Sequence, residues 1–177
     1  MSFLLIALLL ILFVVTMASC VSDFRSLRIP NSHSLAVIGL FIPAYLFAPD
    51  SFGLWWYPFL AAGLMFFISY VMFCYGLMGG GDSKLATALA LWVGLKGLMI
   101  YVFWMAVAGG VIAAFGLWLK AKKPFKNPTE GSWIAQAQGG RNAVPYGIAI
   151  TVGAWAAIFH TESFSKQIHQ LIKIIHS

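Results

Sequence analysis

The chain has 177 residues, of which 61% are hydrophobic and only 9% are charged. A soluble domain of this length cannot hide so much apolar surface from water, so the composition excludes a soluble enzyme or binding module and predicts an all-α membrane protein. The formal net charge of +6 is not interleaved on one exposed soluble face, so it indicates membrane topology and no nucleic-acid partner is expected.

Six apolar runs predict about six transmembrane helices in a single domain, residues 1–177. The predicted spans are 3–21, 35–48, 54–77, 85–95, 98–119 and 143–159, separated on one side by loops 22–34, 78–84 and 120–142. Pro43 interrupts the second run, and residues 94–97 predict a tight turn between the fourth and fifth. Trp55 and Trp56 open the third run as an aromatic belt at a membrane interface.

The basic residues set the expected orientation. Eight of the 11 Lys and Arg fall on one side of the six spans, namely Arg25, Arg28, Lys84, Lys120, Lys122, Lys123, Lys126 and Arg141. The other side holds only three, Lys96, Lys166 and Lys173. By the positive-inside rule, the richer side is predicted to face the cytoplasm.

Two of the five acidic residues follow odd-numbered runs on this same side. Asp23 ends the first run, and Asp82 follows three glycines at the end of the third. Alone, Asp82 or Ser83 would cap the next helix, and Asp23 would be a solvated charge beside Arg25. As a pair they are candidates for catalysis, because a carboxylate at a membrane boundary is costly to desolvate.

An aspartic peptidase needs at least two carboxyl groups for catalysis. Hydrolysis without a metal or a nucleophilic side chain requires one group to take a proton from water and another to polarise the carbonyl oxygen. Two close carboxylates share a proton and divide these roles. Glycines beside Asp82 would leave room for substrate backbone. We therefore expect Asp23 and Asp82 on facing elements, joined by packing of the first and fourth spans, with a non-helical stretch at 79–81.

Three motifs then carry a family resemblance. Gly79-x-Gly81-Asp82-x-Lys84-Leu85 resembles the G-x-G-D-x-K-L motif of bacterial type IV prepilin peptidases. Asp23, followed by Arg25, Ile29, Pro30 and Asn31, is similar to that family's first aspartate segment. Pro145-Tyr146-Gly147 resembles its late P-Y/F-G motif.

The resemblance implies a GxGD aspartic endopeptidase of the bacterial inner membrane that removes short leaders from prepilins or pseudopilins. Asp23 and Asp82 would be catalytic, while Gly79, Gly80, Gly81 and Lys84 would shape the site. Lys84 or Arg25 would contact the substrate, and Pro145 and Tyr146 are expected to start and pack a helix. Because the chain lacks C-x-x-C pairs, it resembles the short peptidase-only branch associated with Flp (Tad) pili, and methyltransferase activity is not expected.

Other interpretations stay open at this point. The chain is alternatively a non-enzymatic membrane protein, such as a small transporter or pilus-assembly subunit, or an archaeal preflagellin peptidase. Loop 120–142 is expected to contact anionic lipid or to dock a substrate leader or a pilus-assembly protein. No metal or cofactor is expected, since His160, His169 and His176 are widely spaced and Cys20 and Cys74 are unpaired in apolar runs.

Overall fold

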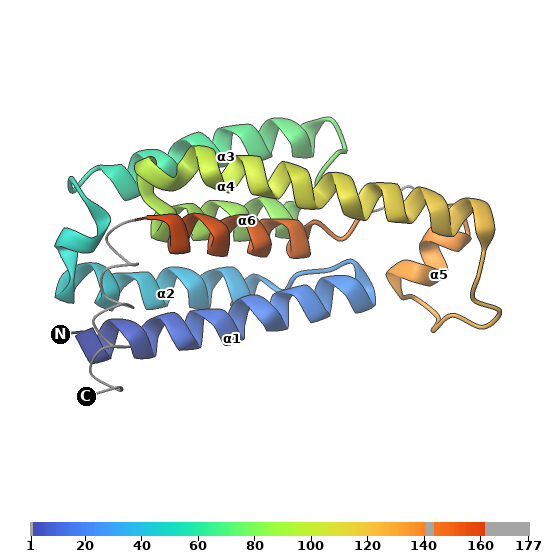
Figure 1. Cartoon of the computed structure of the whole chain (residues 1–177), viewed down its shortest axis with the longest axis horizontal. Helices are drawn as coiled ribbons and strands as arrows, with labels where there is room; N and C mark the ends of the chain where they lie inside the picture. The colour runs from blue at the N-terminus through green and yellow to red at the C-terminus, as the bar shows by residue number, and fades with distance from the viewer. Residues whose placement is uncertain (1, 141–143, 162–177) are drawn as a thin grey trace.

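The computed structural model describes residues 2–140 and 144–161, and these ranges are helical with no strand (Figure 1). The elements are α1 (Ser2–Ser26), α2 (Asn31–Phe47), the short 3₁₀ helix η1 (Pro49–Phe52), α3 (Tyr57–Cys74), α4 (Gly80–Lys122), α5 (Trp133–Gln138) and α6 (Tyr146–His160). Phe3–Ser26, Tyr57–Cys74 and Gly80–Lys122 are long and apolar enough to cross a membrane, and α2 and α6 are shorter apolar helices. The predicted all-α membrane protein is confirmed.

The first loop is shorter than the sequence predicts. Helix α1 continues through the polar residues after Val21 and ends at Ser26, so Asp23 is helical rather than part of a loop. The chain turns at Leu27, whose φ is 51°, and Ser22 Oγ donates a hydrogen bond to the Arg28 carbonyl at 2.8 Å. Pro30 then caps α2 in the extended conformation. The connection between α1 and α2 is thus only residues 27–30.

Helix α4 is a hairpin of two arms. Its 43 residues would measure about 65 Å if straight, twice the thickness of a bilayer core. At Gly94 the backbone is not helical, with φ 65° and ψ 177°. The Tyr101 hydroxyl donates to the Ala86 carbonyl at 3.2 Å, which is possible only if the chain folds back. The first arm is therefore 80–93 and the second 95–122, as the predicted turn at 94–97 requires.

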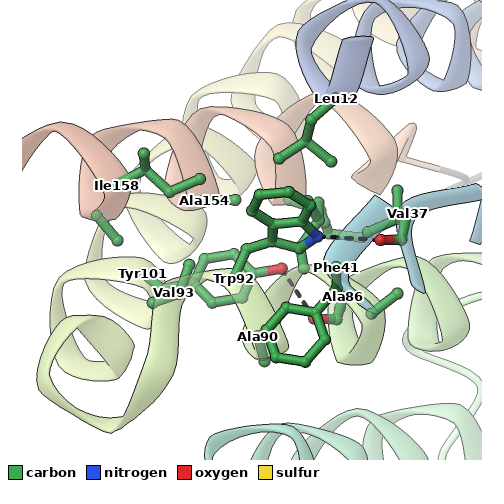
Figure 2. Close-up of a cluster of buried hydrophobic side chains, with 14 of the residues drawn as sticks. Leu12, Val37, Phe41, Ala86, Ala90, Trp92, Val93, Tyr101, Ala154 and Ile158 are labelled. Atoms are coloured by element: carbon green, nitrogen blue, oxygen red, sulfur yellow. Dashed lines mark hydrogen bonds between the residues drawn. The ribbon is translucent and has the colours of Figure 1, made fainter. Parts of the chain in front are cut away.

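The centre of the bundle is packed around Trp92 of the first arm (Figure 2). Its indole N–H donates to the Val37 carbonyl of α2 at 3.0 Å, and Phe41 meets its ring edge-on. Leu12 from α1 and Ile158 from α6 lie against the same cluster, and both are fully buried. The first arm is therefore the central helix, and its position is fixed by contacts with several of the helices around it.

Small residues let α6 approach α4 closely. A β-carbon at Gly153 of α6 would lie 2.6 Å from the Tyr101 carbonyl oxygen and 2.9 Å from the Met105 nitrogen. Close approach through small residues is how helices associate in lipid, where there is no hydrophobic force between them. In Figure 1 the second arm of α4 continues beyond the other helices and carries α5 beneath it, at the end where α1 ends and α6 begins.

Candidate active site

Asp23 lies in the last turn of α1 and faces the start of α6. Its side chain is only 3% exposed. The Gly147 N–H donates a hydrogen bond to Asp23 Oδ2 at 2.8 Å. The first N–H groups of a helix have no intrahelical acceptor and carry a partial positive charge, so α6 offers this carboxylate a favourable donor.

Gly147 approaches Asp23 so closely that a larger residue would require the neighbouring side chains to shift. A β-carbon at this position would lie 3.0 Å from Asp23 Oδ2, 3.1 Å from Asp23 Cβ and 3.1 Å from Ile29 Cδ1. The sequence placed Gly147 only within a motif, and its contact with Asp23 was missed. The available signal was a glycine in the first turn of a helix that begins after Pro145.

Asp82 lies in the first turn of α4 and not at its cap. The N-cap is Gly79, which has no side chain, and Asp82 Oδ2 accepts the Gly79 N–H at 3.2 Å. Asp82 is 8% exposed, and its Oδ1 atom is buried with no hydrogen-bond partner among the described residues. The predicted capping by Asp82 or Ser83 is thus wrong, although Asp82 does stabilise the start of the helix from its third position.

The three glycines differ from one another. Gly79 is extended, but Gly80 and Gly81 are helical, so the predicted non-helical stretch at 79–81 is wrong for two of its three residues. The hydrogen bond from the Gly79 N–H to Asp82 Oδ2 stabilises the first turn, which explains why α4 already begins at Gly80. A β-carbon at Gly81 would lie 3.0 Å from the Ile29 carbonyl oxygen, so this glycine allows the α4 start to press against the loop between α1 and α2.

The next residue anchors the start of α4 to α3. Ser83 and Ser69 are both buried, and their hydroxyl oxygens are 2.8 Å apart in a hydrogen bond. Because Ser83 directly follows Asp82, this bond restricts the rotation of the first turn about the helix axis. The direction of the Asp82 side chain is therefore set by two contacts, one to Gly79 and one through Ser83.

Both carboxyl groups face one cavity of about 460 Å³, which we name the two-aspartate pocket. Its lining residues are Asp23, Leu27, Gly76, Leu77, Met78, Gly79, Asp82, Val144 and Tyr146. The structure thus brings together the two acidic residues that the sequence singled out, 59 positions apart in the chain.

The helices that join them are not the expected pair. We predicted direct packing of the first and fourth spans, but α1 packs mainly against α2 and α6, while α4 packs mainly against α6, α3 and α2. Helices α2 and α6 are the shared neighbours, and the first turn of α6 lies beside Asp23. The prediction failed because nothing local in the sequence reveals that these two helices pack against both of the helices that carry the aspartates.

Arg25 and Lys84 do not line the two-aspartate pocket. The Lys84 ammonium donates to Asn31 Oδ1 at 3.0 Å, linking α4 to the start of α2 on the exposed surface. Arg25 is exposed and lines a separate cavity of about 690 Å³ with Phe24, Phe125 and other residues of the 125–134 segment. Their predicted contacts with a substrate stay predictions.

The remaining motif residues sit at the start of α6. Pro145 is its N-cap and is buried, and Tyr146 is its first residue. The Tyr146 ring lies within 3.6 Å of where a β-carbon at Gly109 would be, and Tyr146 also lines the two-aspartate pocket. These contacts agree with the expected starting and packing roles.

The predicted loop 120–142 contains a helix that the sequence analysis missed. Helix α5 (Trp133–Gln138) is capped by Ser132, whose Oγ accepts the Ala135 N–H at 3.3 Å. Trp133 packs with Leu119 and Ala137, and its ring meets Phe24 of α1 at a centroid distance of 5.8 Å. The signal was present in Ser132 followed by six residues without Gly or Pro.

Several expectations concern residues outside the described ranges, or absences. Arg141, Lys166, Lys173, His169 and His176 lie outside the described residues. Within residues 2–140 and 144–161, no group of three or more His, Cys, Asp or Glu side chains could hold a metal ion. The expectation that the chain needs no metal or cofactor stays a prediction.

Comparison with protein families matches residues 6–114 to the type IV leader peptidase family. The chain belongs to this family. The matched region contains both aspartates of the pocket and ends within the second arm of α4. Family membership identifies the chain as a peptidase and implies a pilin-type substrate. Comparison with curated proteins finds no significant match, and neither does comparison with solved structures.

Proposed function

We propose that the chain is a membrane aspartic endopeptidase that removes the short N-terminal leader from prepilin or pseudopilin substrates. The observation that carries this proposal is the common pocket of Asp23 and Asp82, two buried carboxyl groups from different helices. Buried carboxyl groups need partners or a function, and each of these has only one backbone N–H donor among the described contacts.

The hydrogen bonds of the two carboxyl groups favour Asp23 as the general base and Asp82 as the general acid. Asp23 Oδ2 accepts the shorter bond, 2.8 Å from Gly147 N–H at a helix start, which stabilises the ionised form. Asp82 Oδ1 is buried and accepts no hydrogen bond from any described residue, so a negative charge on this carboxyl group is poorly stabilised and its protonated form is favoured. In this mechanism ionised Asp23 takes a proton from water as the water oxygen attacks the carbonyl carbon. Asp82 gives its proton to the carbonyl oxygen, which produces a tetrahedral diol. As the C–N bond breaks, the proton on Asp23 passes to the leaving nitrogen and a hydroxyl proton of the diol returns to Asp82.

The finer features of the proposal follow the motif resemblance. The substrate would be a prepilin of the Flp (Tad) type, and the chain would work in the bacterial inner membrane with both aspartates on the cytoplasmic side. The excess of basic residues at this end of the bundle supports that orientation. Methyltransferase activity is not part of the proposal.

The direct test is cleavage of a co-expressed Flp-type prepilin by Asp23→Asn and Asp82→Asn variants. Each change keeps the shape of the side chain but removes the acid, so we expect at least about a 100-fold loss of cleavage. Processing is read as a shift on a gel, with the new N-terminus found by mass spectrometry.

The matched control is Asp50→Asn. Asp50 is an exposed acid in η1, at the opposite end of the bundle from the pocket, so this variant should cleave at the wild-type rate. Near wild-type processing by a well-inserted Asp23→Asn or Asp82→Asn variant would exclude that aspartate from the chemistry.

A further inference from the structure

A second cavity adjoins the two-aspartate pocket on the other side of Asp82. It has a volume of about 540 Å³, and we name it the glycine pocket. Its lining residues are Ser22, Ser26, Leu27, Arg28, Ile29, Pro30, Asn31, Gly79, Gly80, Gly81 and Asp82. Its walls are the loop between α1 and α2 and the first turn of α4.

Among the residues that the structure describes, three line both cavities, namely Leu27, Gly79 and Asp82. Gly79 has no side chain. The shared lining residues that carry a side chain are therefore Asp82, with its candidate catalytic carboxyl group, and Leu27. Leu27 is not one of the motif residues, and it takes no part in the proton transfers proposed above.

Leu27 is held in place by an unusual backbone and by packing. Its φ of 51° is in the left-handed region, which a leucine rarely adopts. Its N–H donates to the Asp23 carbonyl at 2.7 Å, so its position follows that of Asp23. Its side chain packs against the cluster of Leu119, Trp133 and Ala137. The end of α4 and helix α5 thus support Leu27.

This arrangement suits an extended peptide. In an extended chain, successive side chains point to opposite sides, and each residue advances by about 3.3 Å. The two residues that flank a peptide bond therefore need two separate spaces with a divider between them. The first N–H groups of α4, at Gly80 and Gly81, have no intrahelical acceptor and lie at the glycine pocket, where they can bind substrate carbonyl groups.

We propose that the two cavities are the subsites for the substrate residues on the two sides of the cleaved bond, and that Leu27 divides them and sets the sequence preference. The proposal rests on the peptidase function proposed above and adds its specificity determinant. The two-aspartate pocket, which Leu77, Met78, Val144 and Tyr146 line together with the aspartates, takes one flanking residue. The glycine pocket takes the other.

The test uses purified protein and a prepilin in which the residue on each side of the cleavage point is set to Gly, Leu or Trp. The wild-type protein should prefer Leu to Trp by about tenfold or more in kcat/KM at the position held by the two-aspartate pocket. Removing the divider in Leu27→Ala or Leu27→Gly joins the cavities, so this preference should fall to about threefold or less. Both variants are used because glycine tolerates the positive φ and should fold if alanine does not.

Three comparisons make the result specific to Leu27. Leu27→Met keeps a side chain of similar volume and should keep the wild-type preference. Leu77→Ala removes the same atoms from one cavity only and should change the preference at one flanking position. Trp133→Ala, which removes support behind Leu27 without lining either cavity, should lower the preference in the same direction as Leu27→Ala.

The outcomes separate this proposal from the peptidase function. If Leu27→Ala and Leu27→Gly cleave all substrates with the wild-type preference, or slow all of them by one common factor, Leu27 is not the divider and the proposal is overturned. Failure of the peptidase function would be a different result, the absence of cleavage by the wild-type protein, and it would overturn both proposals together.

Discussion

The hydrogen bond between Gly147 and Asp23 joins two residues that are 124 positions apart in the sequence. The bond positions one candidate catalytic carboxyl group by means of the first turn of α6. Because a β-carbon would lie 3.0–3.1 Å from Asp23 and Ile29, glycine is the only residue that allows this approach without displacing Asp23. Gly147 acts through Asp23 and is a positioning residue.

We therefore expect Gly147→Ala to lower kcat by about tenfold with little change in KM, since the added β-carbon shifts Asp23 and a shift of about 1 Å at a reacting group would cost about 100-fold. The control is Gly110→Ala in the second arm of α4, where a β-carbon would meet nothing within 4 Å. Prepilin cleavage rates for the two variants give the comparison. A Gly147→Ala protein with wild-type kcat would show that Asp23 does not depend on this contact.

The sequence alone identifies the two aspartates but not their surroundings. Asp23 and Asp82 could be singled out because charged residues are rare in an apolar chain. The contact of Gly147 with Asp23 could not, because it depends on how distant helices pack. Gly80 and Gly81 were expected to be non-helical from their intrinsic flexibility, but the bond from Gly79 N–H to Asp82 Oδ2 stabilises a helix there.

At the scale of elements, the reversal inside α4 decides the architecture. A continuous apolar helix of 43 residues would leave the bundle, yet Gly94 turns it back so that Tyr101 reaches Ala86. The turn at 94–97 was predictable because glycines stand at both ends of a polar Lys96. The end of α1 was less predictable, since Ser22, Asp23 and Arg25 suggest a loop, while contacts of α1 with α6 and α5 keep them helical.

Replacing Gly94 tests this reversal. Its φ of 65° and ψ of 177° lie in a region that is essentially restricted to glycine, so Gly94→Ala should lower the free energy of unfolding by about 1–3 kcal/mol. Unfolding in detergent, followed by circular dichroism, measures the change.

A second glycine serves as the control for that measurement. Gly39→Ala in α2 adds a β-carbon that meets nothing within 4 Å at a helical position, so it should leave the stability unchanged or raise it by up to about 1 kcal/mol. Equal stability of the Gly94→Ala and wild-type proteins would mean that the reversal tolerates a side chain.

At the scale of the whole molecule, the basic residues and the pocket share one end. Helix α5, the end of α1 and the end of α4 gather there, and the residues of the 120–126 segment add Lys120, Lys122, Lys123 and Lys126. The opposite end carries η1 and the exposed Trp55 and Trp56. The proposed orientation therefore places Asn127 in the cytoplasm and Leu54 outside it.

Cysteine labelling tests the orientation. In a background with Cys20→Ser and Cys74→Ser, Leu54→Cys should react with a membrane-impermeant maleimide in intact cells. Asn127→Cys should react only after the membrane is opened. Both native residues are exposed, so access to the residue itself does not limit the reaction. The opposite labelling pattern would place the aspartates on the outer side of the membrane and contradict the proposed prepilin processing.

The turn at Gly94 also has a consequence for how such a site tolerates change in its gene. The chain passes along the bundle twice between Asp23 and Asp82, through α2 and α3, and twice between Asp82 and Gly147, through the two arms of α4. The three residues meet because an even number of helical segments separates each from the next. Adding or removing a pair of helices would keep them at the same end of the bundle, whereas adding or removing a single helix would move the residues that follow it to the opposite end. Gly94 is the residue at which straightening of one helix would make that change.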